Sequence, residues 1–383
     1  MIIGIDGNEA NVEKKVGVSE YAYELLWQFY KNQEFRLRQG SGGQAGIRNQ
    51  VYLKDNPRDD LPIERDGWNY RVVKPHKFWT QFGLPFDLYF HRPHPDVFFT
   101  PTHYAPRFCP VPSVISIMDL SYVHFPQMFR KSDLYQLQNW TAYSVRNARR
   151  ILTISEASEN DIIKHYRLKP EKVVVTYPGV KKDSGIKNHK LSMEDLRKRY
   201  GVGNDYILFV GTLQPRKNIV RLIEAFSQLD SPSNLTLAVV GKPGWLYEEI
   251  YKAPKKFGVE GKVKFLDYVP NEDLPLLYKN ALCFVLPSLY EGFGLPVLEA
   301  MTYGCPVVTS NVSSLPEAAG EAAILVDPES VESIKEGIEK VIGDKTLRDS
   351  LVKKGYEQVK KFSWEKCAKE TLKVLEEVGG GHF

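Results

Sequence analysis

The sequence predicts an α/β protein in which two tandem Rossmann-like, doubly wound domains face a cleft. Three observations predict this fold class. At 383 residues the chain is too long for one small core, since a domain usually takes about 150 residues. Short apolar runs alternate with helical patterns in both halves, which favours parallel sheets covered by helices. A polar, basic stretch at 181–190 separates the halves, so we expect an N-terminal domain at 1–178 and a C-terminal domain at 179–362.

Composition excludes several classes of protein. The 51 basic and 47 acidic residues leave a net charge of only +4, too little for the concentrated basic surface of a nucleic-acid-binding protein. The four cysteines are far apart and form no CxxC pair, which argues against a zinc site or a disulfide framework (Cys109, Cys283, Cys305 and Cys367). No apolar run reaches the roughly 18 residues of a membrane span, and residues 1–5 read as a strand rather than a signal peptide. We therefore expect a cytoplasmic protein.

Apolar runs in the first half predict strands at 1–5, 50–53, 96–100, 112–117, 151–154 and 172–176. Helical spacing of apolar residues predicts helices at 21–30, at 132–150 and from Ser155 onward. The loop before the first helix contains Gly17 but no GxGxxG pattern, so a dinucleotide-binding fingerprint is absent, and a turn glycine explains Gly17 more simply. Four glycines within 40–46 predict a flexible surface insertion at about 39–47, to which we assign no function.

Two polar loops of the first half are candidate ligand sites, because ligands bind outside the carboxyl ends of parallel strands. The first loop contains His103, and the second contains Met118 and Asp119, with His124 shortly after it. A structural role explains either histidine equally well. The stretch 68–108 is rich in aromatic, proline and basic residues. It favours an aromatic core with solvated cations, or alternatively a peripheral contact with the inner face of an anionic membrane.

The second half repeats the alternation more regularly. Its expected strands are 206–210, 235–240, 263–266, 282–286, 306–309 and 323–326. Its expected helices are 217–229, 247–257, 272–281, 296–303, 314–319 and 330–342. The chain then continues with helical patterns at 346–360 and 363–378, without a further strand.

A basic loop follows the first strand of the second half. Arg216 and Lys217 come after the strand at 206–210 and directly before a helix. A guanidinium fork, an ammonium and free helix N–H groups can converge there on a diphosphate. For either residue alone, a solvated loop cation is the simpler interpretation.

The segment 287–310 is a second loop of this kind, leading from a strand through a helix to the next strand. Gly292 and Gly294 allow close approach of the backbone to a ligand, and the helix that starts near Pro296 directs free N–H groups into the loop. Two carboxylates frame the loop, Glu291 and Glu299. The alternative interpretation is that the glycines form a turn and Glu299 complements a helix dipole. Taken together, the two loops favour a nucleotide-diphosphate pocket over the structural interpretations of each loop alone.

Both loops carry the motifs of a known family. Residues 211–218 read GTLQPRKN and residues 287–301 read PSLYEGFGLPVLEAM. They resemble the retaining nucleotide-sugar glycosyltransferases of family 4 (glycosyltransferase group 1), which have the GT-B fold, and the similarity covers nearly the whole chain. The PRKN variant is similar to that of several mannosyltransferases. The resemblance also implies that the final helix, 363–378, crosses back onto the first domain.

The resemblance assigns roles to individual residues. Glu299 would bind the nucleotide ribose and Glu291 the hydroxyls of the donor sugar. Arg216 and Lys217 would neutralise the diphosphate, and Gly17 would close on the phosphates from the opposite domain. The implied donor-binding set is Gly17, Arg216, Lys217, Glu291, Gly292, Phe293, Gly294, Leu295 and Glu299. The implied catalytic set is Glu291, Asp119, Arg216 and Lys217.

One position departs from the family pattern. Relatives usually carry His-Asp in the loop that approaches the donor sugar, whereas this chain has Met118-Asp119. Methionine cannot donate a hydrogen bond to a sugar hydroxyl or carry a proton. Either Asp119, His103 or His124 takes over these contacts, or activity is weak. We rank Asp119 first because it keeps the family position.

These observations predict a metal-independent, retaining hexosyltransferase without a cofactor. No Asp-x-Asp motif occurs, so Arg216, Lys217 and helix N-termini would stabilise the departing nucleoside diphosphate. The expected donor is GDP-mannose, ahead of UDP-glucose or UDP-N-acetylglucosamine, and the expected acceptor is a saccharide or a lipid-linked molecule. Alternatives are a sugar-nucleotide epimerase, a glycogen-synthase-like polymerase, and a nucleotide-sugar-binding protein without turnover. A dehydrogenase is disfavoured because neither domain has the glycine fingerprint.

Overall fold

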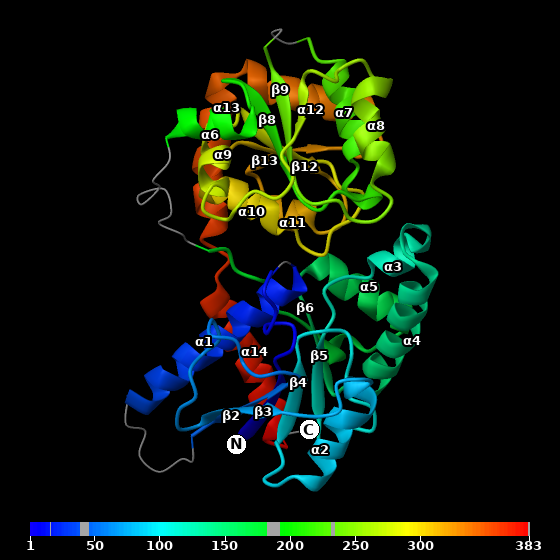
Figure 1. The fold of residues 1–383 in the computed structure, drawn as a ribbon, viewed down its shortest axis with the longest axis vertical. Coiled ribbons are helices and arrows are strands. Elements are labelled where there is room, and N and C mark those ends of the chain that lie inside the picture. The colour runs from blue at the N-terminus through cyan, green and yellow to red at the C-terminus, as the bar shows by residue number, and fades with distance from the viewer. Residues whose placement is uncertain (16, 39–45, 182–191, 231–233, 382–383) are drawn as a thin grey trace. The chain divides into compact units, whose positions relative to one another are not determined.

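The computed structural model describes residues 1–15, 17–38, 46–181, 192–230 and 234–381. They form two compact units, which are described separately below (Figure 1). The first unit comprises Met1–Val123, Arg130–Gly179 and Ser363–Phe383. The second comprises Val180–Phe362 and the short segment His124–Phe129. The expected insertion at 39–47 and the polar stretch at 181–190 fall almost entirely outside the described residues.

A parallel sheet of seven strands forms the centre of the described part of the first unit, in the order β3-β2-β1-β4-β5-β6-β7. The strands are β1 (Ile2–Asp6), β2 (Arg48–Leu53), β3 (Trp68–Val72), β4 (Val97–Thr100), β5 (Ser113–Ser116), β6 (Arg150–Thr153) and β7 (Val173–Val175). The strand order reverses between β1 and β4, and ligands bind at such reversals in open α/β sheets.

Helices α1 (Val18–Arg38) and α14 (Trp364–Gly379) lie side by side on one face of this sheet (Figure 1). Their apolar sides form a single core with the strands, in which Leu25, Phe29 and Leu375 are almost completely buried. The start of the final helix lies very close to the backbone of Gly179: a Cβ atom at Gly179 would lie 2.0 Å from the backbone nitrogen of Trp364. Glycine at this position lets the end of the chain pack against the first unit.

The segment between β3 and β4 packs against strand residues that point away from the core of α1 and α14. A π-helical turn, η1 (Trp79–Gly83), continues into α2 (Leu84–Phe90), and Trp79, Leu84 and Leu88 are buried against Tyr52 and Phe98. The remaining helices of this part of the chain are α3 (Ser121–His124), η2 (Pro126–Met128), α4 (Lys131–Asn147), α5 (Glu156–Tyr166) and η3 (Pro170–Lys172).

A second parallel sheet, with the order β10-β9-β8-β11-β12-β13, forms the centre of the described part of the second unit. Its strands are β8 (Tyr206–Val210), β9 (Thr236–Val240), β10 (Val263–Phe265), β11 (Cys283–Leu286), β12 (Val307–Ser310) and β13 (Ala323–Val326). Its helices are α6 (Met193–Tyr200), η5 (Pro215–Lys217), α7 (Ile219–Ser227), α8 (Glu248–Lys256), α9 (Leu274–Asn280), α10 (Leu295–Thr302), α11 (Leu315–Ala319), α12 (Val331–Gly343) and α13 (Lys345–Val359). The order reverses between β8 and β11, so their carboxyl ends lie side by side.

The predicted fold class is confirmed, since both units are parallel α/β sheets with the predicted strands. The prediction missed β3, because only Trp68 of this edge strand is fully buried and its sequence shows no apolar run. It also extended the long helix too far: α4 ends at Asn147, and Arg150 opens β6. No helix in the described ranges combines the length and apolar character needed to cross a membrane.

Candidate functional site

The two loops singled out in the second half meet at the carboxyl ends of β8 and β11. Asn218 joins them: its backbone is in the left-handed region (φ 60°), and its side-chain amide donates to the carbonyl oxygens of Pro287 (2.9 Å) and Pro328 (2.7 Å). The backbone N–H of Leu289 also donates to the carbonyl of Arg216 (2.9 Å). The basic loop therefore has a fixed position beside the loop that precedes α10.

Arg216, Lys217 and Glu291 form a buried ion cluster between these loops. The Lys217 Nζ lies 2.5 Å from Glu291 Oε1, and an Arg216 guanidinium nitrogen lies 3.0 Å from Glu291 Oε2. The Ser288 hydroxyl donates to the same carboxylate (2.7 Å), and Arg216 also donates to the carbonyl of Tyr290 (2.5 Å). Glu291 is 7% exposed and Lys217 8%. Two cations against one carboxylate leave the cluster with a net charge of +1.

The electrostatics of the cluster keep Glu291 ionised. Burial by itself would raise the pKa of this carboxyl, but the neighbouring Lys217 and Arg216 and the hydrogen bonds from Lys217 and Ser288 outweigh burial and lower the pKa to about 2. A buried carboxylate that is ionised at neutral pH holds both cations in place.

Acidification is expected to destabilise the protein through Glu291. The pKa falls from its ordinary value of 4.5 to about 2 on folding, so the stabilisation is complete above pH 4.5 and is lost as the pH falls toward 2. At about 1.4 kcal/mol per pKa unit the full loss is about 3 kcal/mol. Urea unfolding of wild type and Glu291→Gln across this pH range measures it. The free energy of unfolding of Glu291→Gln should depend less steeply on pH than that of the wild type. Glu336→Gln on α12 is the control. Equal slopes for wild type and Glu291→Gln would contradict the ion pairs of Glu291.

Gly294 shapes the start of α10. It adopts φ 106°, a conformation that side chains disfavour, and a Cβ atom there would lie 2.8 Å from a methyl carbon of Leu315. The preceding carbonyl of Glu291 accepts hydrogen bonds from the hydroxyls of Ser313 (2.5 Å) and Ser314 (2.8 Å). These contacts fix the loop that contains Gly292, ahead of the first N–H groups of the helix at Leu295.

The remaining donor candidates of this loop differ in their surroundings. Phe293 is 2% exposed and its ring packs edge-on against that of Phe362 (5.2 Å between centroids), so its side chain belongs to the core of the unit. Glu299, on α10, is partly exposed and accepts a hydrogen bond from the hydroxyl of buried Tyr278 (3.1 Å). This bond fixes one carboxylate oxygen of Glu299.

The structure brings three first-half candidates together in the first unit. The backbone N–H of Met118 donates to His103 Nε2 (3.4 Å), and Asp119 accepts from the backbone N–H of Ser121 (2.8 Å). Burial lowers the pKa of His103, and the nearby charge of Asp119 opposes this effect. The neutral imidazole is therefore favoured. Met118 is 7% exposed and contributes to the apolar core, so of the candidates in this loop pair only Asp119 and His103 have polar side chains.

The other two candidates lie elsewhere. Gly17 is exposed just before α1, with φ 55° and no atom within 4 Å of a Cβ placed on it. His124 groups with the second unit, where its ring lies 4.9 Å from that of Tyr290, next to Glu291. Sequence reasoning placed His124 with Asp119 because only five positions separate them.

Sequence reasoning missed three polar residues. Ser288 and Asn218 hold the cluster together. Their positions shortly after β11 and η5 are the sequence feature that could have identified them. Asp6 ends β1 at the carboxyl edge of the first sheet and binds the backbone and side-chain nitrogens of Asn8. Burial raises the pKa of Asp6 to about 6, against the hydrogen bonds from Asn8.

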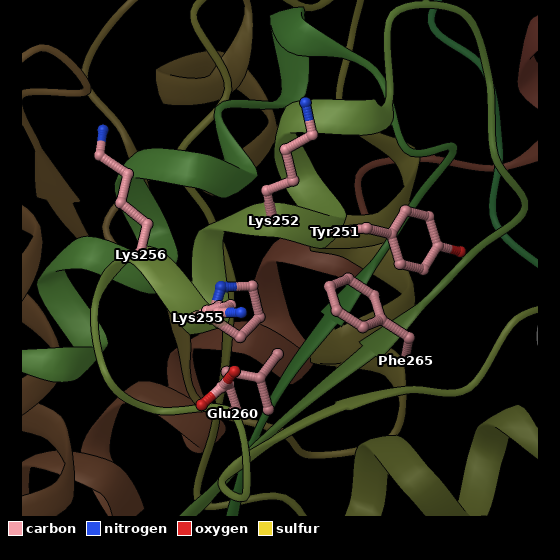
Figure 2. Close-up of a pocket in the computed structure, with 8 residues that line it drawn as sticks. Tyr251, Lys252, Lys255, Lys256, Glu260 and Phe265 are labelled. Carbon is pink, nitrogen blue, oxygen red and sulfur yellow. The ribbon is translucent and has the colours of Figure 1, made fainter.

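A separate pocket of about 660 Å³ lies beside α8 and β10 (Figure 2). The rings of Tyr251 and Phe265 lie next to each other there, tilted, with their centroids 4.5 Å apart. Its lining residues are Tyr251, Lys252, Pro254, Lys255, Lys256, Glu260, Val263 and Phe265. None of them belongs to the predicted donor set.

Comparison with known proteins agrees with these motifs. Residues 192–358 match the family model described as glycosyl transferases group 1, and residues 42–184 match that of glycosyltransferase family 4. The O-antigen chain mannosyltransferase B of Escherichia coli is 33% identical over 305 residues, 79% of this chain and 78% of that protein. The serotype-specific mannosyltransferase WbdA of Escherichia coli is 30% identical over 224 residues, 57% of this chain and 27% of that protein.

Solved structures share the fold at lower identity. Sucrose-phosphate synthase of Thermosynechococcus elongatus superposes with a TM-score of 0.73 at 18% identity, covering 99% of both chains. WaaG, a glycosyltransferase involved in lipopolysaccharide biosynthesis, gives a TM-score of 0.69 at 19% identity, covering 98% of this chain and 99% of its own. Both likenesses extend over both units.

Proposed function

Because the chain belongs to the family 4 glycosyltransferases, we propose that it is a metal-independent, retaining enzyme that moves a hexosyl group from a nucleotide-diphosphate sugar to a saccharide or lipid-linked acceptor. The observation that carries this proposal is the buried cluster of Arg216, Lys217 and Glu291 at the carboxyl ends of β8 and β11. Its net positive charge suits a diphosphate. Cations held in fixed positions suit the departing diphosphate, because its negative charge increases during the reaction.

The proposed reaction breaks the bond between the anomeric carbon and the β-phosphate oxygen. The acceptor hydroxyl oxygen bonds to the anomeric carbon on the same face, and its proton passes to an oxygen of the departing phosphate. Arg216 and Lys217 stabilise the negative charge that develops on the diphosphate, together with N–H groups at the start of α10. No protein base is required for this proton transfer.

The other residues are given roles around this step. From the family resemblance, we assign the Glu299 carboxylate to the ribose. Glu291 keeps the cations oriented and meets the donor-sugar hydroxyls. From the family resemblance, we assign Gly17 to the phosphates and Asp119 to the donor sugar. We assign His103 to the support of Asp119, since its imidazole accepts from the backbone N–H of Met118 and feels the charge of Asp119.

GDP-mannose is the proposed donor. The two Escherichia coli relatives are named mannosyltransferases, and the PRKN loop of this chain carries the ion cluster described above. A second candidate function is nucleotide-sugar binding without turnover, which the buried Met118 favours because no histidine occupies that position. Tight nucleotide binding without product over long incubation would distinguish it from the first.

Nucleotide binding is expected to stabilise the protein against thermal unfolding. GDP should raise the melting temperature more than UDP or ADP, because a ligand that binds only the folded state stabilises it by about 2.7 kcal/mol at a hundred times its Kd. Glu299→Gln keeps an acceptor for Tyr278 but removes the charge, and should weaken GDP binding about tenfold. Glu336→Gln on α12 is the matched control. No shift with any of the three nucleotides would contradict the proposed donor site.

A further inference from the structure

Large aromatic side chains are exposed along η1 and α2 of the first unit. The exposed fractions are 55% for Phe78, 66% for Phe82, 66% for Phe86, 48% for Tyr89 and 69% for Phe90. Residues spaced by three or four positions share one side of a helix, so these rings lie in a row. The rings of Phe86 and Phe90 are in tilted contact with their centroids 4.6 Å apart, and Phe78 meets Phe82 edge-on at 6.3 Å.

This face is not needed to attach the segment to its own unit. The opposite side already buries Trp79, Leu84 and Leu88, each at most 1% exposed. The segment is therefore apolar on both sides, one side in the core and one in solvent. Soluble proteins rarely expose contiguous apolar surface of this kind unless it contacts a partner or a membrane.

A neighbouring loop adds a further exposed ring. The backbone N–H of Arg107 donates to the carbonyl of Thr80 (3.1 Å), which places the 70% exposed Phe108 beside η1. Phe78 and Phe108 both adopt left-handed backbone conformations, with φ of 55° and 50°. That conformation costs a bulky residue about 1–2 kcal/mol, which glycine would avoid. The chain thus retains aromatic side chains at two positions where they weaken the fold.

The exposed charged residues of this segment are cationic, and one exposed carboxylate from another segment, Asp55, lies near its start, 3.6 Å from His76. Lys74, Lys77 and Arg92 are exposed at the two ends of the segment. Asp87 is the sole acidic residue between 74 and 95, and it is buried in a bidentate pair with Arg71 (2.6 and 2.8 Å). Solvent therefore meets aromatic rings and positive charge together.

We propose that this surface, the aromatic ridge of Phe78, Phe82, Phe86, Tyr89, Phe90 and Phe108, docks the protein onto an anionic lipid bilayer. The rings enter the boundary between headgroups and acyl chains, and Lys74, Lys77 and Arg92 contact the lipid phosphates. A second copy of the chain is a poorer partner. A two-fold interface would bring two copies of this cationic surface together, and like charges repel each other. The proposal does not depend on the sugar-transfer reaction.

Vesicle sedimentation of the full chain tests this docking. Wild type should pellet with phosphatidylcholine vesicles that contain phosphatidylglycerol, and much less with phosphatidylcholine alone. The double variant Phe82→Ser/Phe86→Ser should lower the partition coefficient about tenfold or more, and Lys77→Glu/Arg92→Glu should lower it on anionic vesicles in particular. Tyr135→Ser and Lys164→Glu, at exposed positions on α4 and α5, are the matched controls.

Hydrogen exchange of the wild type gives a second measurement that does not depend on the folding of any variant. Anionic vesicles should protect peptides that cover 78–91 and leave those that cover 156–166 unchanged. Equal pelleting with both vesicle types, or unchanged pelleting of the Phe82→Ser/Phe86→Ser variant, would overturn the proposal. Concentration-dependent dimerisation that this variant abolishes, without lipid binding by the wild type, would assign the ridge to self-association and also overturn it.

Discussion

Replacing Lys217 with methionine is expected to lower kcat/KM for the nucleotide-sugar donor by about a thousandfold. Lys217 is 8% exposed and its ammonium lies 2.5 Å from Glu291 Oε1, so in the proposed site it would meet the departing diphosphate with little competing water. Loss of one preorganised donor to a developing negative charge usually costs two to three orders of magnitude in rate. Initial rates of nucleoside diphosphate release, with donor and acceptor present, measure the effect.

Lys242→Met is the matched control for this variant. Lys242 is an exposed lysine of the same unit, and its ammonium lies over the ring of Tyr268 at 4.6 Å. It should retain wild-type activity. Lys217→Met also leaves Glu291 with one ion partner fewer, so thermal melting must accompany the assay. A folded Lys217→Met protein with wild-type kcat/KM would show that the cluster has no part in transfer.

Replacing Gly241 with alanine is expected to destabilise the second unit by roughly 4 kcal/mol or more. A Cβ atom at this position would lie 1.9 Å from the carbonyl oxygen of Gly211, and φ is 149°. The backbones at the ends of β8 and β9 meet here, and the Gly211 N–H donates to Val240 (2.9 Å). A methyl group would force these ends apart and displace the loop that carries Lys217.

Thermal and urea unfolding measure this effect. A loss of this size corresponds to a fall in melting temperature of about 10 °C for a unit of this length. Gly261→Ala is the matched control, because nothing lies within 4 Å of a Cβ atom at Gly261. Similar melting temperatures for the two variants would show that the ends of β8 and β9 accommodate a methyl group at position 241.

The strands of both sheets were predictable because they are buried on both faces. Residues 283–286 are each 0% exposed, and such strands read as continuous apolar runs. The edge strand β3 was missed because polar residues follow its one fully buried side chain, Trp68. The helical segment 79–90 was missed because its exposed rings erase the contrast between the two faces.

The candidate site was predictable as two loops, but its bonding was not. The positions of Arg216 and Lys217 after one strand and Glu291 after another follow from the local pattern. Their direct ion pairs span 74 and 75 positions of sequence and depend on β8 lying next to β11. The structure adds a role for Glu291 that the local pattern does not contain, since its carboxylate pairs with both cations.

The role of Arg216 and Lys217 as the diphosphate-binding pair is tested most directly by comparing a nucleoside diphosphate with its nucleoside. Calorimetry of GDP and guanosine with wild type and Lys217→Met isolates the contribution of the phosphates. Wild type should bind GDP at least about a hundredfold more tightly than guanosine, and the variant should lose more than about tenfold in GDP affinity with guanosine binding unchanged. Unchanged GDP affinity, or equal losses for both ligands, would contradict the assignment.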